Sequence, residues 1–444
     1  MKLIKHLIPV EIGNGEKIII NSLNGRIDKL SLTAYEIVDK WKGVDNIAPE
    51  NEVEAALLTN LNSRGYLVNS HDEEFIRKKD LVAQLREADK KQKETCKHIT
   101  FILTYNCNFR CPYCFEGEST LKREIISPEQ IDAALRLAGD NLESVGLFGG
   151  EPLMPSNRSS LEYLFSKTKD KPINITTNGY FLEEFFDILF PLKFIHVTVT
   201  LDGEENTHNS RRYLVGGKPT YDKIMRGVKK YLENGMPIHV RMNIERSNFE
   251  EAHRLRQSLI DEFEHFGKLL SFEMGTVFGI PNEDKTEIIT KTYLGDINYS
   301  PEERLRRNAL FGRNNSIINN ITAGEELKPT YSFCIAHSNS FLVDPYGLIY
   351  TCIPSVGKPQ LSISMYYPNI EFKKKSIYTR NIETISECKE CVYSLLCGGG
   401  CPLGNMACPD DIMKPECFSI KNQVHNLLPK FYNMNIEAER HKGC

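Results

Sequence analysis

Strand-like and helix-like segments alternate from residue 98 to about residue 280, and this alternation constrains the fold more than any other feature of the chain. The strand-like segments are HITFILTYN, SVGLFGG, INITTNG, IHVTVTLDG, PIHVRMNIE and LSFEMGTV. Helix-like segments such as PEQIDAALRLAGDNLES and YDKIMRGVKKYLENG lie between them. The pattern predicts an α/β fold with a parallel sheet, either a barrel or an open sheet, covered by helices. Functional groups in such folds gather at the C-terminal ends of the strands.

The length and composition indicate an ordinary globular protein of several domains. The chain has 444 residues, 41% of them hydrophobic and 26% charged, with a net charge of −4, so nothing in the balance points to a nucleic acid or an anionic membrane as partner. The N-terminal MKLIKHLIPVEIGNGEK lacks the apolar run and cleavage site of a secretory signal. No stretch approaches the roughly 20 apolar residues of a membrane span. We therefore expect a cytoplasmic protein.

The loop TYNCNFRCPYCFEG follows the first of these strands and contains Cys107, Cys111 and Cys114. The C-x3-C-x2-C spacing lets one loop present three thiolates to three irons of a 4Fe–4S cluster, leaving the fourth iron open to a small molecule. A structural zinc would need a fourth ligand such as His98, and zinc motifs normally contain paired C-x2-C units. In a cytosolic chain, clustered cysteines favour metal ligation over disulfides. The loop therefore predicts an iron–sulfur cluster with an open iron.

With the aromatic Tyr113 just before its last cysteine, this loop resembles that of the radical S-adenosylmethionine (SAM) superfamily. The resemblance implies a partial (β/α)6 TIM barrel and a catalytic cluster on the three cysteines. SAM would bind the open iron and be cleaved to a 5′-deoxyadenosyl radical, with the electron coming from a reductant such as flavodoxin or ferredoxin. The cofactor then carries the difficult chemistry and the protein positions it.

Three further stretches resemble motifs of the same superfamily: GGEP after the second strand, TTNGY after the third and VTLDGEENTHNSRR after the fourth. The resemblance implies that Glu151 receives the SAM ammonium, Thr200 the ribose and Arg212 the carboxylate. Thr200 replaces the usual serine and keeps its hydroxyl, whereas Asn209 replaces the usual aspartate with an uncharged side chain. A surface position for Arg212, which adjoins Arg211, is the alternative. The implied SAM-contacting residues are Tyr113, Gly149, Gly150, Glu151, Pro152, Asn178, Thr200 and Arg212.

Seven more cysteines in motif-like order lie after residue 330. SFLVDPYGLIYT predicts a hairpin with a type I turn at Asp344–Gly347, flanked by cysteines. The whole order resembles the SPASM extension of radical SAM enzymes, which carries two auxiliary 4Fe–4S clusters, so we expect three clusters in all. The resemblance assigns one auxiliary cluster to Cys388, Cys391, Cys397 and Cys417, and the other to Cys334, Cys352 and Cys401.

The second of these auxiliary clusters lacks a fourth cysteine, because the residues after Cys334 read IAHSNSFL. Its fourth iron is therefore open, or Cys408 or His337 completes it. An open iron would suit a substrate thiolate, since thiolate is a natural soft ligand.

The N-terminal residues read as a small α+β unit, with strands in IPVEIG and EKIIINS and helices in LTAYEIVDKWK and EVEAALLTNLNSRGYLV. This unit resembles the winged-helix peptide-recognition element of ribosomal peptide maturation systems, which would bind a leader peptide by strand addition; a structural cap is the alternative. The predicted domains are the recognition domain 1–70, a solvated linker helix 71–97, the radical SAM core 98–280, a bridging segment 281–330 and the SPASM domain 331–444.

We interpret the chain as an enzyme that cross-links a ribosomally made precursor peptide, first by cysteine thioether bonds and second by carbon–carbon or carbon–oxygen bonds. A protein-modifying maturase is an alternative. The sulfatase-maturing type is disfavoured because Ile353, rather than an aspartate, follows Cys352. The alternative from another class is a non-catalytic iron–sulfur or zinc protein, which would not cleave SAM.

Overall fold

The chain forms two compact units, each built from segments far apart in the sequence. The first unit contains residues 1–91, 290–337 and 380–444, and the second contains residues 92–289 and 338–379. The computed structural model describes residues 1–13, 15–117, 124–277, 279, 284, 287, 288, 317, 326–334, 340–372, 376–404 and 412–430. The domain boundaries expected from the sequence remain predictions. Most of the bridging segment 281–330 lies outside the described residues.

The first unit begins with a three-stranded antiparallel sheet in the order β2-β3-β4. Its strands are β2 Leu7–Gly13, β3 Glu16–Asn21 and β4 Ile27–Leu30. Short strands β1 Lys2–Leu3 and β5 Leu67–Val68 pair with each other. The strands expected in IPVEIG and EKIIINS are confirmed as β2 and β3. The other three strands were missed, because two-residue strands carry no readable periodicity and β4 (IDKL) is short and half polar.

Two helices pack on this sheet and confirm the two that were expected. Helix α1 (Leu32–Lys40) begins after Ser31, whose hydroxyl accepts a hydrogen bond from the Ala34 N–H at 3.2 Å. Helix α2 (Glu52–Ser63) begins after Asn51, whose side chain accepts from the Glu54 N–H at 2.9 Å. Such caps satisfy N–H groups that a helix start leaves without partners. The helices enclose a core with buried aromatic residues, including Trp41 and Tyr66.

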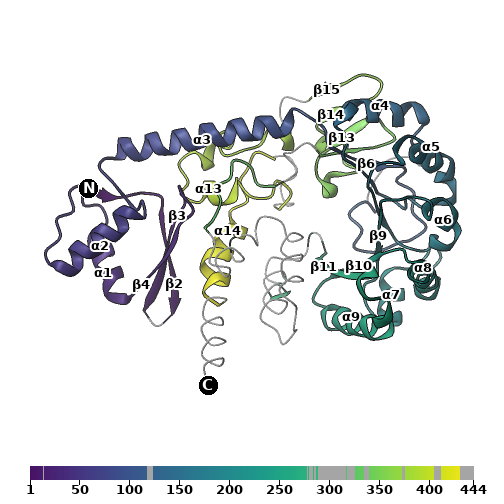
Figure 1. The fold of residues 1–444 in the computed structure, drawn as a ribbon, viewed down its shortest axis with the longest axis horizontal. Coiled ribbons are helices and arrows are strands. Elements are labelled where there is room, and N and C mark those ends of the chain that lie inside the picture. Colours follow the sequence, from purple (N-terminus) through teal and green to yellow (C-terminus); the bar gives the residue numbers. More distant parts are fainter. Residues whose placement is uncertain are drawn as a thin grey trace. The chain divides into compact units, whose positions relative to one another are not determined.

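Helix α3 (His71–Lys93) confirms the long helix expected after residue 70 but not its expected solvation. Its side chain at Val82 is buried against a cluster from the C-terminal part of the chain that includes Tyr331, Ile385 and Leu395. Figure 1 shows α3 running above α13 (Ser394–Cys397) and α14 (Phe418–Asn422). The high charge of this segment concealed the apolar contact, because most of its charged residues lie on its exposed faces. The helix is therefore a packed element of the first unit.

The second unit is built on a parallel sheet whose six strands confirm the six strand-like segments of the sequence. All six run parallel, in the spatial order β11-β10-β9-β8-β7-β6. Helices lie outside the strands (Figure 1). The strands are β6 His98–Ile102, β7 Ser144–Phe148, β8 Ile173–Thr177, β9 Ile195–Thr200, β10 Ile238–Ile244 and β11 Leu270–Thr276. The helices are α4 Pro128–Ala138, α5 Arg158–Thr168, α6 Leu182–Leu189, α7 Glu205–Arg211, α8 Tyr221–Glu233 and α9 Phe249–Glu262.

The hairpin expected from SFLVDPYGLIYT is confirmed and extends this sheet. Strand β12 (Ser340–Val343) pairs with β13 (Leu348–Tyr350), and the Gly347 N–H donates to the Asp344 carbonyl at 3.1 Å. Gly347 has φ of 77°, which a side chain would strain. Strand β12 also lies parallel to β6, and β14 (Ser364–Met365) and β15 (Glu371–Phe372) continue the sheet. That this hairpin joins the parallel sheet could not be predicted, since strand pairing over such a separation leaves no local signal.

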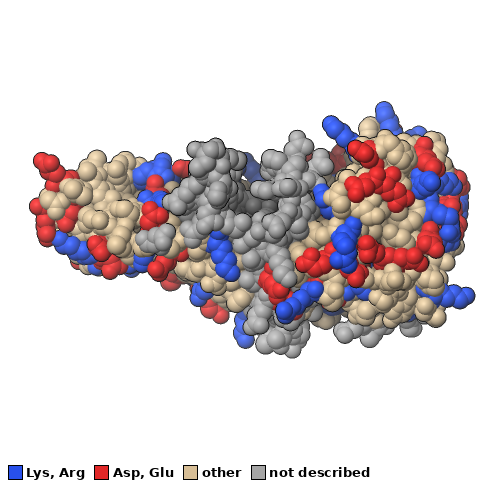
Figure 2. Space-filling model, turned by 90° about the horizontal axis from the view of Figure 1, so that it is seen from below, with Lys and Arg blue, Asp and Glu red and all other residues tan. Residues whose placement is uncertain are grey.

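The surface agrees with the composition. On the face drawn in Figure 2, positive and negative side chains are interspersed over the part of the chain that the structure describes. None of the described helices has both the length and the apolar character needed to cross a membrane.

Candidate active site

The three-cysteine loop lies at the C-terminal end of β6, where the sequence placed it. Turn hydrogen bonds shape it: the Cys114 N–H donates to the Cys111 carbonyl at 3.1 Å, and the Phe109 N–H donates to the Cys107 sulfur at 3.4 Å. Burial, together with negative charge on Glu151, Cys111 and Cys114, raises the pKa of the Cys107 thiol to about 12. The three thiols are therefore close enough to influence one another.

The donor set of this loop fits a metal centre. The described cysteines form no disulfide, so these thiols are available as ligands. Their raised pKa values mean that a positively charged metal is needed to hold them as thiolates. Among the described residues, no group of three His, Cys, Asp or Glu side chains is arranged to hold a single ion.

The loop after β7 touches the cysteine loop through Gly150. This glycine has φ of 50°, and an added Cβ would lie 2.4 Å from the Asn106 carbonyl oxygen and 2.6 Å from that of Thr104. Gly149 is equally confined, because its Cβ would lie 2.5 Å from a methyl group of Ile102. Backbone this close to backbone leaves room only for glycine. The paired glycines therefore set the distance between the two loops.

Replacing Gly150 with alanine should weaken SAM binding at least tenfold, because the methyl group would push the two loops apart. Equilibrium dialysis of the anaerobically reconstituted protein with labelled SAM measures this. Gly139→Ala is the matched control, since Gly139 has φ of 52° with nothing within 4 Å of its Cβ position. It carries the same backbone strain without the clash. Equal SAM affinity in the two variants would contradict the close-packing argument.

Glu151 joins three loops at the centre of the site. Its fully buried carboxylate accepts from the Thr177 hydroxyl at 2.6 Å, the Asn178 N–H at 2.7 Å and the Leu153 N–H at 2.8 Å. Its own N–H donates to the Asn106 carbonyl at 2.8 Å. Burial raises the pKa of Glu151 despite these donors. The expected contact with a SAM ammonium stays a prediction, and the structure adds a positioning role, since this carboxylate ties the ends of β7 and β8 together.

A second buried carboxylate in the site, Glu116, was missed from the sequence. One oxygen accepts from the Gly150 N–H at 2.6 Å, and the other is buried with no hydrogen-bond partner among the described residues. Burial raises the pKa of Glu116 to about 7, and the Gly150 N–H opposes the shift. One feature of the sequence could have identified Glu116: it stands two residues after Cys114 in CFEG, and this position keeps it inside the cysteine loop.

Tyr113 and Arg212, which the sequence predicts as SAM-contacting residues, are hydrogen-bonded to each other across the site. The Arg212 guanidinium donates to the Tyr113 hydroxyl at 2.7 Å, and that hydroxyl donates to the Asp202 carboxylate. Arg212 is buried, so the alternative of a surface arginine is wrong. Burial raises the pKa of Cys111, while the positive charge of Arg212 lowers it. The guanidinium therefore faces the cysteine loop.

Asp202 and Asn243 were missed, although they complete this network. The Asp202 carboxylate also accepts from the Asn243 N–H at 3.1 Å, and the Asn243 amide reaches the Tyr113 hydroxyl at 3.5 Å. Asp202 stands in the LDG segment that the sequence analysis quoted. Asn243 had no local signal, because only the register of β10 beside β9 brings it here.

The remaining predicted residues are also located in this region. Asn178 donates to the Asn108 side chain at 2.8 Å and lies 3.8 Å from the Cys107 sulfur. Thr200 is buried at the end of β9, and Pro152 is buried beside Glu151. Asn209 accepts from the N–H groups of Thr220 and Tyr221 at 2.8 and 3.0 Å. An asparagine oxygen performs this capping as an aspartate would, which explains the departure from the expected motif.

The C-terminal cysteines are only partly brought together by described residues. Burial raises the pKa of Cys388 to about 12, and the charges of Cys397, Cys391 and Cys417 add to the shift, so these four thiols are neighbours. Cys334 and Cys401 belong to the same unit, whereas Cys352 belongs to the second unit. The grouping of the latter three stays a prediction. Cys408 and His337, the suggested fourth ligands, lie outside the described residues.

A buried guanidinium lies among these cysteines. Arg380 is fully buried and donates to the carbonyls of Gly399 and Gly400, both at 2.6 Å, and to those of Ile412 and Lys414 at 2.8 and 2.9 Å. Burial lowers the pKa of Arg380, while negative charge on nearby cysteines, Cys334 and Cys401 among them, raises it. The sequence analysis missed this residue, because nothing in the letters SIYTRNIE marks an arginine as buried.

Comparison with known proteins agrees with this geometry. Residues 101–259 match the Radical SAM superfamily, and they include the cysteine loop, the Gly149-Gly150-Glu151 loop and Arg212. The chain contains a radical SAM domain. Members of this superfamily bind SAM and a 4Fe–4S cluster.

Among curated relatives, this domain is similar to the sporulation killing factor maturation protein SkfB of Bacillus subtilis, with 30% identity over 155 residues. That match covers 34% of this chain and 37% of SkfB, so the chain spans little more than a third of the length of that relative.

Two solved structures have the same radical SAM α/β fold with a central parallel sheet. SuiB of Streptococcus suis bound to S-adenosylmethionine has a TM-score of 0.52 at 16% identity, covering 95% of this chain and 100% of that one. The native protein anSMEcpe with bound AdoMet has a TM-score of 0.55 at 18% identity, covering 76% of this chain and 98% of that one.

Proposed function

We propose that this protein is a radical SAM enzyme that cross-links a ribosomally made precursor peptide, with cysteine thioether bonds as the product. The observation that carries the proposal is the convergence of four loops on one site: the cysteine loop, the Gly149–Glu151 loop, the Asn178 loop and the Arg212 segment. Bound SAM and a reduced cluster would supply a 5′-deoxyadenosyl radical, which removes a hydrogen atom from the peptide. Three clusters, one reductant such as flavodoxin or ferredoxin, and a cytoplasmic location are parts of the same proposal.

The residues of the chain would position SAM rather than react with it. Cys107, Cys111 and Cys114 would ligate the cluster. The Arg212 guanidinium suits the SAM carboxylate, and the unpartnered oxygen of Glu116 adds a second acceptor for an ammonium near Glu151. Burial of these groups keeps water from competing for the same hydrogen bonds.

The peptide substrate is supported by what related proteins are called and by what one of them binds. SkfB is named a maturation protein of the sporulation killing factor, and SuiB has been solved with its precursor peptide SuiA. Thioether formation is our first choice because the C-terminal cysteines include a set that lacks a fourth cysteine. That set, Cys334, Cys352 and Cys401, would form one of two SPASM-type auxiliary clusters. Carbon–carbon or carbon–oxygen bond formation, a protein-modifying maturase and a non-catalytic metal protein are the alternatives.

The N-terminal domain offers a route for leader binding. Strand β4 lies at the end of the order β2-β3-β4, so its outer edge is available to an added strand within the described part of this sheet. A leader peptide in extended conformation would pair with this edge through main-chain hydrogen bonds. We therefore assign residues 1–70 as a winged-helix-like recognition domain.

The product decides between these alternatives. We expect the reconstituted protein with SAM, dithionite and a candidate precursor, a short Cys-containing peptide encoded beside its gene, to release one 5′-deoxyadenosine per cross-link. The peptide should lose two hydrogens per bond, and iodoacetamide should label one fewer cysteine per bond. A lighter peptide whose thiols all remain alkylatable would reject the thioether and favour the carbon–carbon or carbon–oxygen alternative. No 5′-deoxyadenosine at all would reject the enzyme and favour the non-catalytic metal protein.

A further inference from the structure

A cavity of about 440 Å³ in the first unit borders one proposed auxiliary cluster through Cys388, and the proposed chemistry gives the rest of its lining no role. It lies where the residues before β2, one side of helix α3 and the segment 382–394 meet. All of its lining residues belong to the first unit. Its volume is within the range of roughly 300–1000 Å³ that is usual for ligand pockets.

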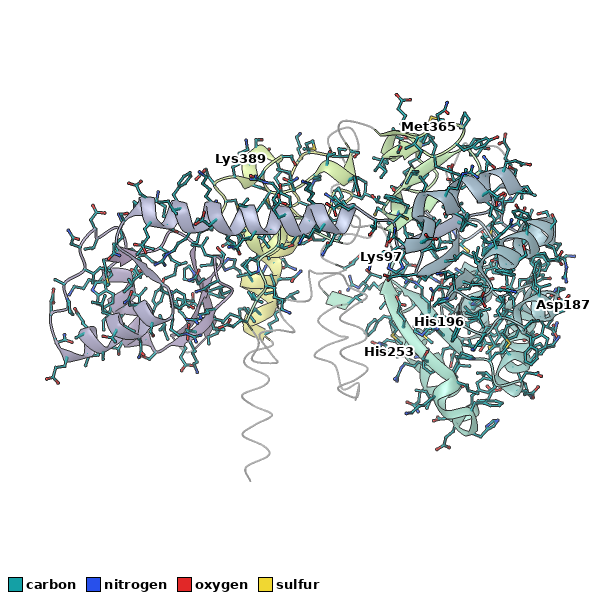
Figure 3. All side chains as sticks on the ribbon, turned by 45° about the horizontal axis from the view of Figure 1, so that its top comes forward. Lys97, Asp187, His196, His253, Met365 and Lys389 are labelled. Carbon is teal, nitrogen blue, oxygen red and sulfur yellow. The ribbon has the colours of Figure 1, made fainter. Side chains whose placement is uncertain are left out.

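Positive charge dominates this cavity. Its lining includes five lysine or arginine residues and three glutamates, an excess of two positive charges. Glu74 bonds to His6 at 2.7 Å, and Glu383 bonds to Arg86. Lys5, Lys79 and Lys389 are exposed lysines of the lining, and Figure 3 shows Lys389 beside α3. The cavity therefore favours a ligand that carries negative charge.

His6 contributes a buried ring nitrogen to the wall of the cavity. Its Nδ1 lies 2.7 Å from the Glu74 carboxylate, and because a carboxylate accepts, this nitrogen carries a proton. The other ring nitrogen, Nε2, is buried and has no hydrogen-bond partner among the described residues, while the His6 side chain is 10% exposed. An unpartnered nitrogen here calls for a hydrogen-bonding group in the ligand, and a peptide bond supplies both an N–H and a C=O.

The same cavity has an apolar part. Val82 and Ile382 are buried in its lining, and Phe75 is 64% exposed beside them. An exposed phenylalanine gains stability when a ligand covers it, at roughly 25 cal/mol for each Å² removed from water. The cavity thus combines cations, one unpartnered imidazole nitrogen and an apolar surface within the reach of a few residues of peptide.

From this combination we infer that the cavity binds an acidic segment of the peptide substrate, with a peptide group on His6 Nε2, carboxylates at Lys5 and Lys79, and an apolar side chain over Phe75. The inference rests on the proposed function, because it assigns the acidic peptide to the precursor. It adds a second contact, separate from the edge of β4, and it gives α3 a role in binding. A precursor peptide that binds both the edge of β4 and this cavity would contain glutamate or aspartate beside leucine-like residues.

The test uses two fluorescein-labelled hexapeptides, one of alternating Glu and Leu and one of alternating Gln and Leu, with the reconstituted full-length protein. Fluorescence anisotropy should show the acidic probe binding at least tenfold more tightly. The double variant Lys5→Glu/Lys79→Glu should weaken the acidic probe at least tenfold and leave the neutral probe unchanged. Lys90→Glu/Lys91→Glu is the matched control, because it makes the same charge change on exposed α3 residues outside the lining. It should change neither affinity more than twofold.

His6→Phe separates the imidazole from the charges. It keeps an aromatic ring but removes Nε2, so the binding of both probes, which have the same backbone groups, should weaken by a similar factor. The Lys variants test the inference even if His6→Phe fails to fold. Equal binding of the two probes to the wild type, or equal behaviour of the two double variants, would overturn it. A different result would assign the cavity to a redox partner. In that case flavodoxin would reduce the clusters of Lys5→Glu/Lys79→Glu more slowly than those of the wild type and of Lys90→Glu/Lys91→Glu, and the wild type would show no preference for the acidic probe.

SAM cleavage with dithionite, measured on the same preparations, separates this inference from the proposed function. If cleavage is normal but the acidic probe is not preferred, the peptide cavity is wrong and the enzyme stands. If the probe behaves as expected but no 5′-deoxyadenosine forms, the proposed function is wrong while the cavity remains a peptide site.

Discussion

Replacing Cys107, Cys111 and Cys114 together with alanine should abolish SAM cleavage and remove about four of about twelve irons from the reconstituted protein. The reason is that one loop supplies all three ligands, so no other described thiol near it can replace them. Iron analysis and chromatographic detection of 5′-deoxyadenosine measure the two effects. The loss of SAM cleavage should exceed the loss caused by any single substitution in the SAM-contacting loops.

Cys96→Ala is the matched control for this variant. Cys96 is buried next to β6 and burial raises its pKa to about 12, but it belongs to neither cysteine motif. Its loss should leave both iron content and SAM cleavage within the error of the wild type. If the triple variant still cleaves SAM, the cysteine loop is not the catalytic centre and the proposed function falls.

The sequence was most informative where a local pattern and a local structure coincide. The six parallel strands, the two N-terminal helices and the turn at Asp344–Gly347 all follow from periodicity and turn residues within a few positions. The cysteine loop and the Gly149-Gly150-Glu151 stretch were found for a similar reason: close approach of backbone demands residue types that stand out in a sequence.

Long-range pairing explains what the sequence did not predict. Asn243 reaches Tyr113 only because β10 lies in register beside β9, and β12 joins β6 across more than two hundred residues. Helix α3 was expected to be solvated because its composition is highly charged, yet Val82 packs against residues near 385. In each case the deciding contact comes from another segment, so no window of the sequence contains it.

Burial of charged groups was equally hidden. Glu116, Asp202 and Arg380 carry charges that normally stay at the surface. Whether a single charged residue is buried cannot be predicted from the sequence alone. Asp202 is held by Tyr113, Asn243 and an ion pair with Arg211, and Arg380 by four carbonyls, whereas Glu116 has one backbone N–H partner and one unpartnered oxygen among the described residues. Such residues concentrate at sites that hold ligands or irregular loops, as these three do.

Arg380→Met should destabilise the first unit by about 3 kcal/mol or more and remove most of the iron bound outside the cysteine loop. The arginine donates to carbonyls of two segments, Gly399–Gly400 before Cys401 and Ile412–Lys414 before Cys417. Hydrogen bonds from a charged group contribute about 1.5–3 kcal/mol each, and removing the donor leaves buried carbonyls without partners. Both segments lead directly into proposed cluster ligands, so loosening them should release those clusters.

Urea unfolding and iron analysis measure the two effects of Arg380→Met. Arg77→Met is the control, because Arg77 is half-exposed in the same unit and, within the described part of the chain, has Glu73 as its ion-pair partner. Exposed pairs of this kind contribute at most about 1 kcal/mol, so iron content should stay unchanged.

Arg380→Lys distinguishes the two roles of the guanidinium: a lysine keeps the positive charge beside the cysteines but reaches fewer carbonyls. We expect Arg380→Lys to lose stability and iron nearly as Arg380→Met does, since the bonds to two segments, rather than the charge, hold the ligands in place. Full iron in Arg380→Lys would show that charge alone suffices, and full iron in Arg380→Met would show that the buried guanidinium does not organise the cysteines at all.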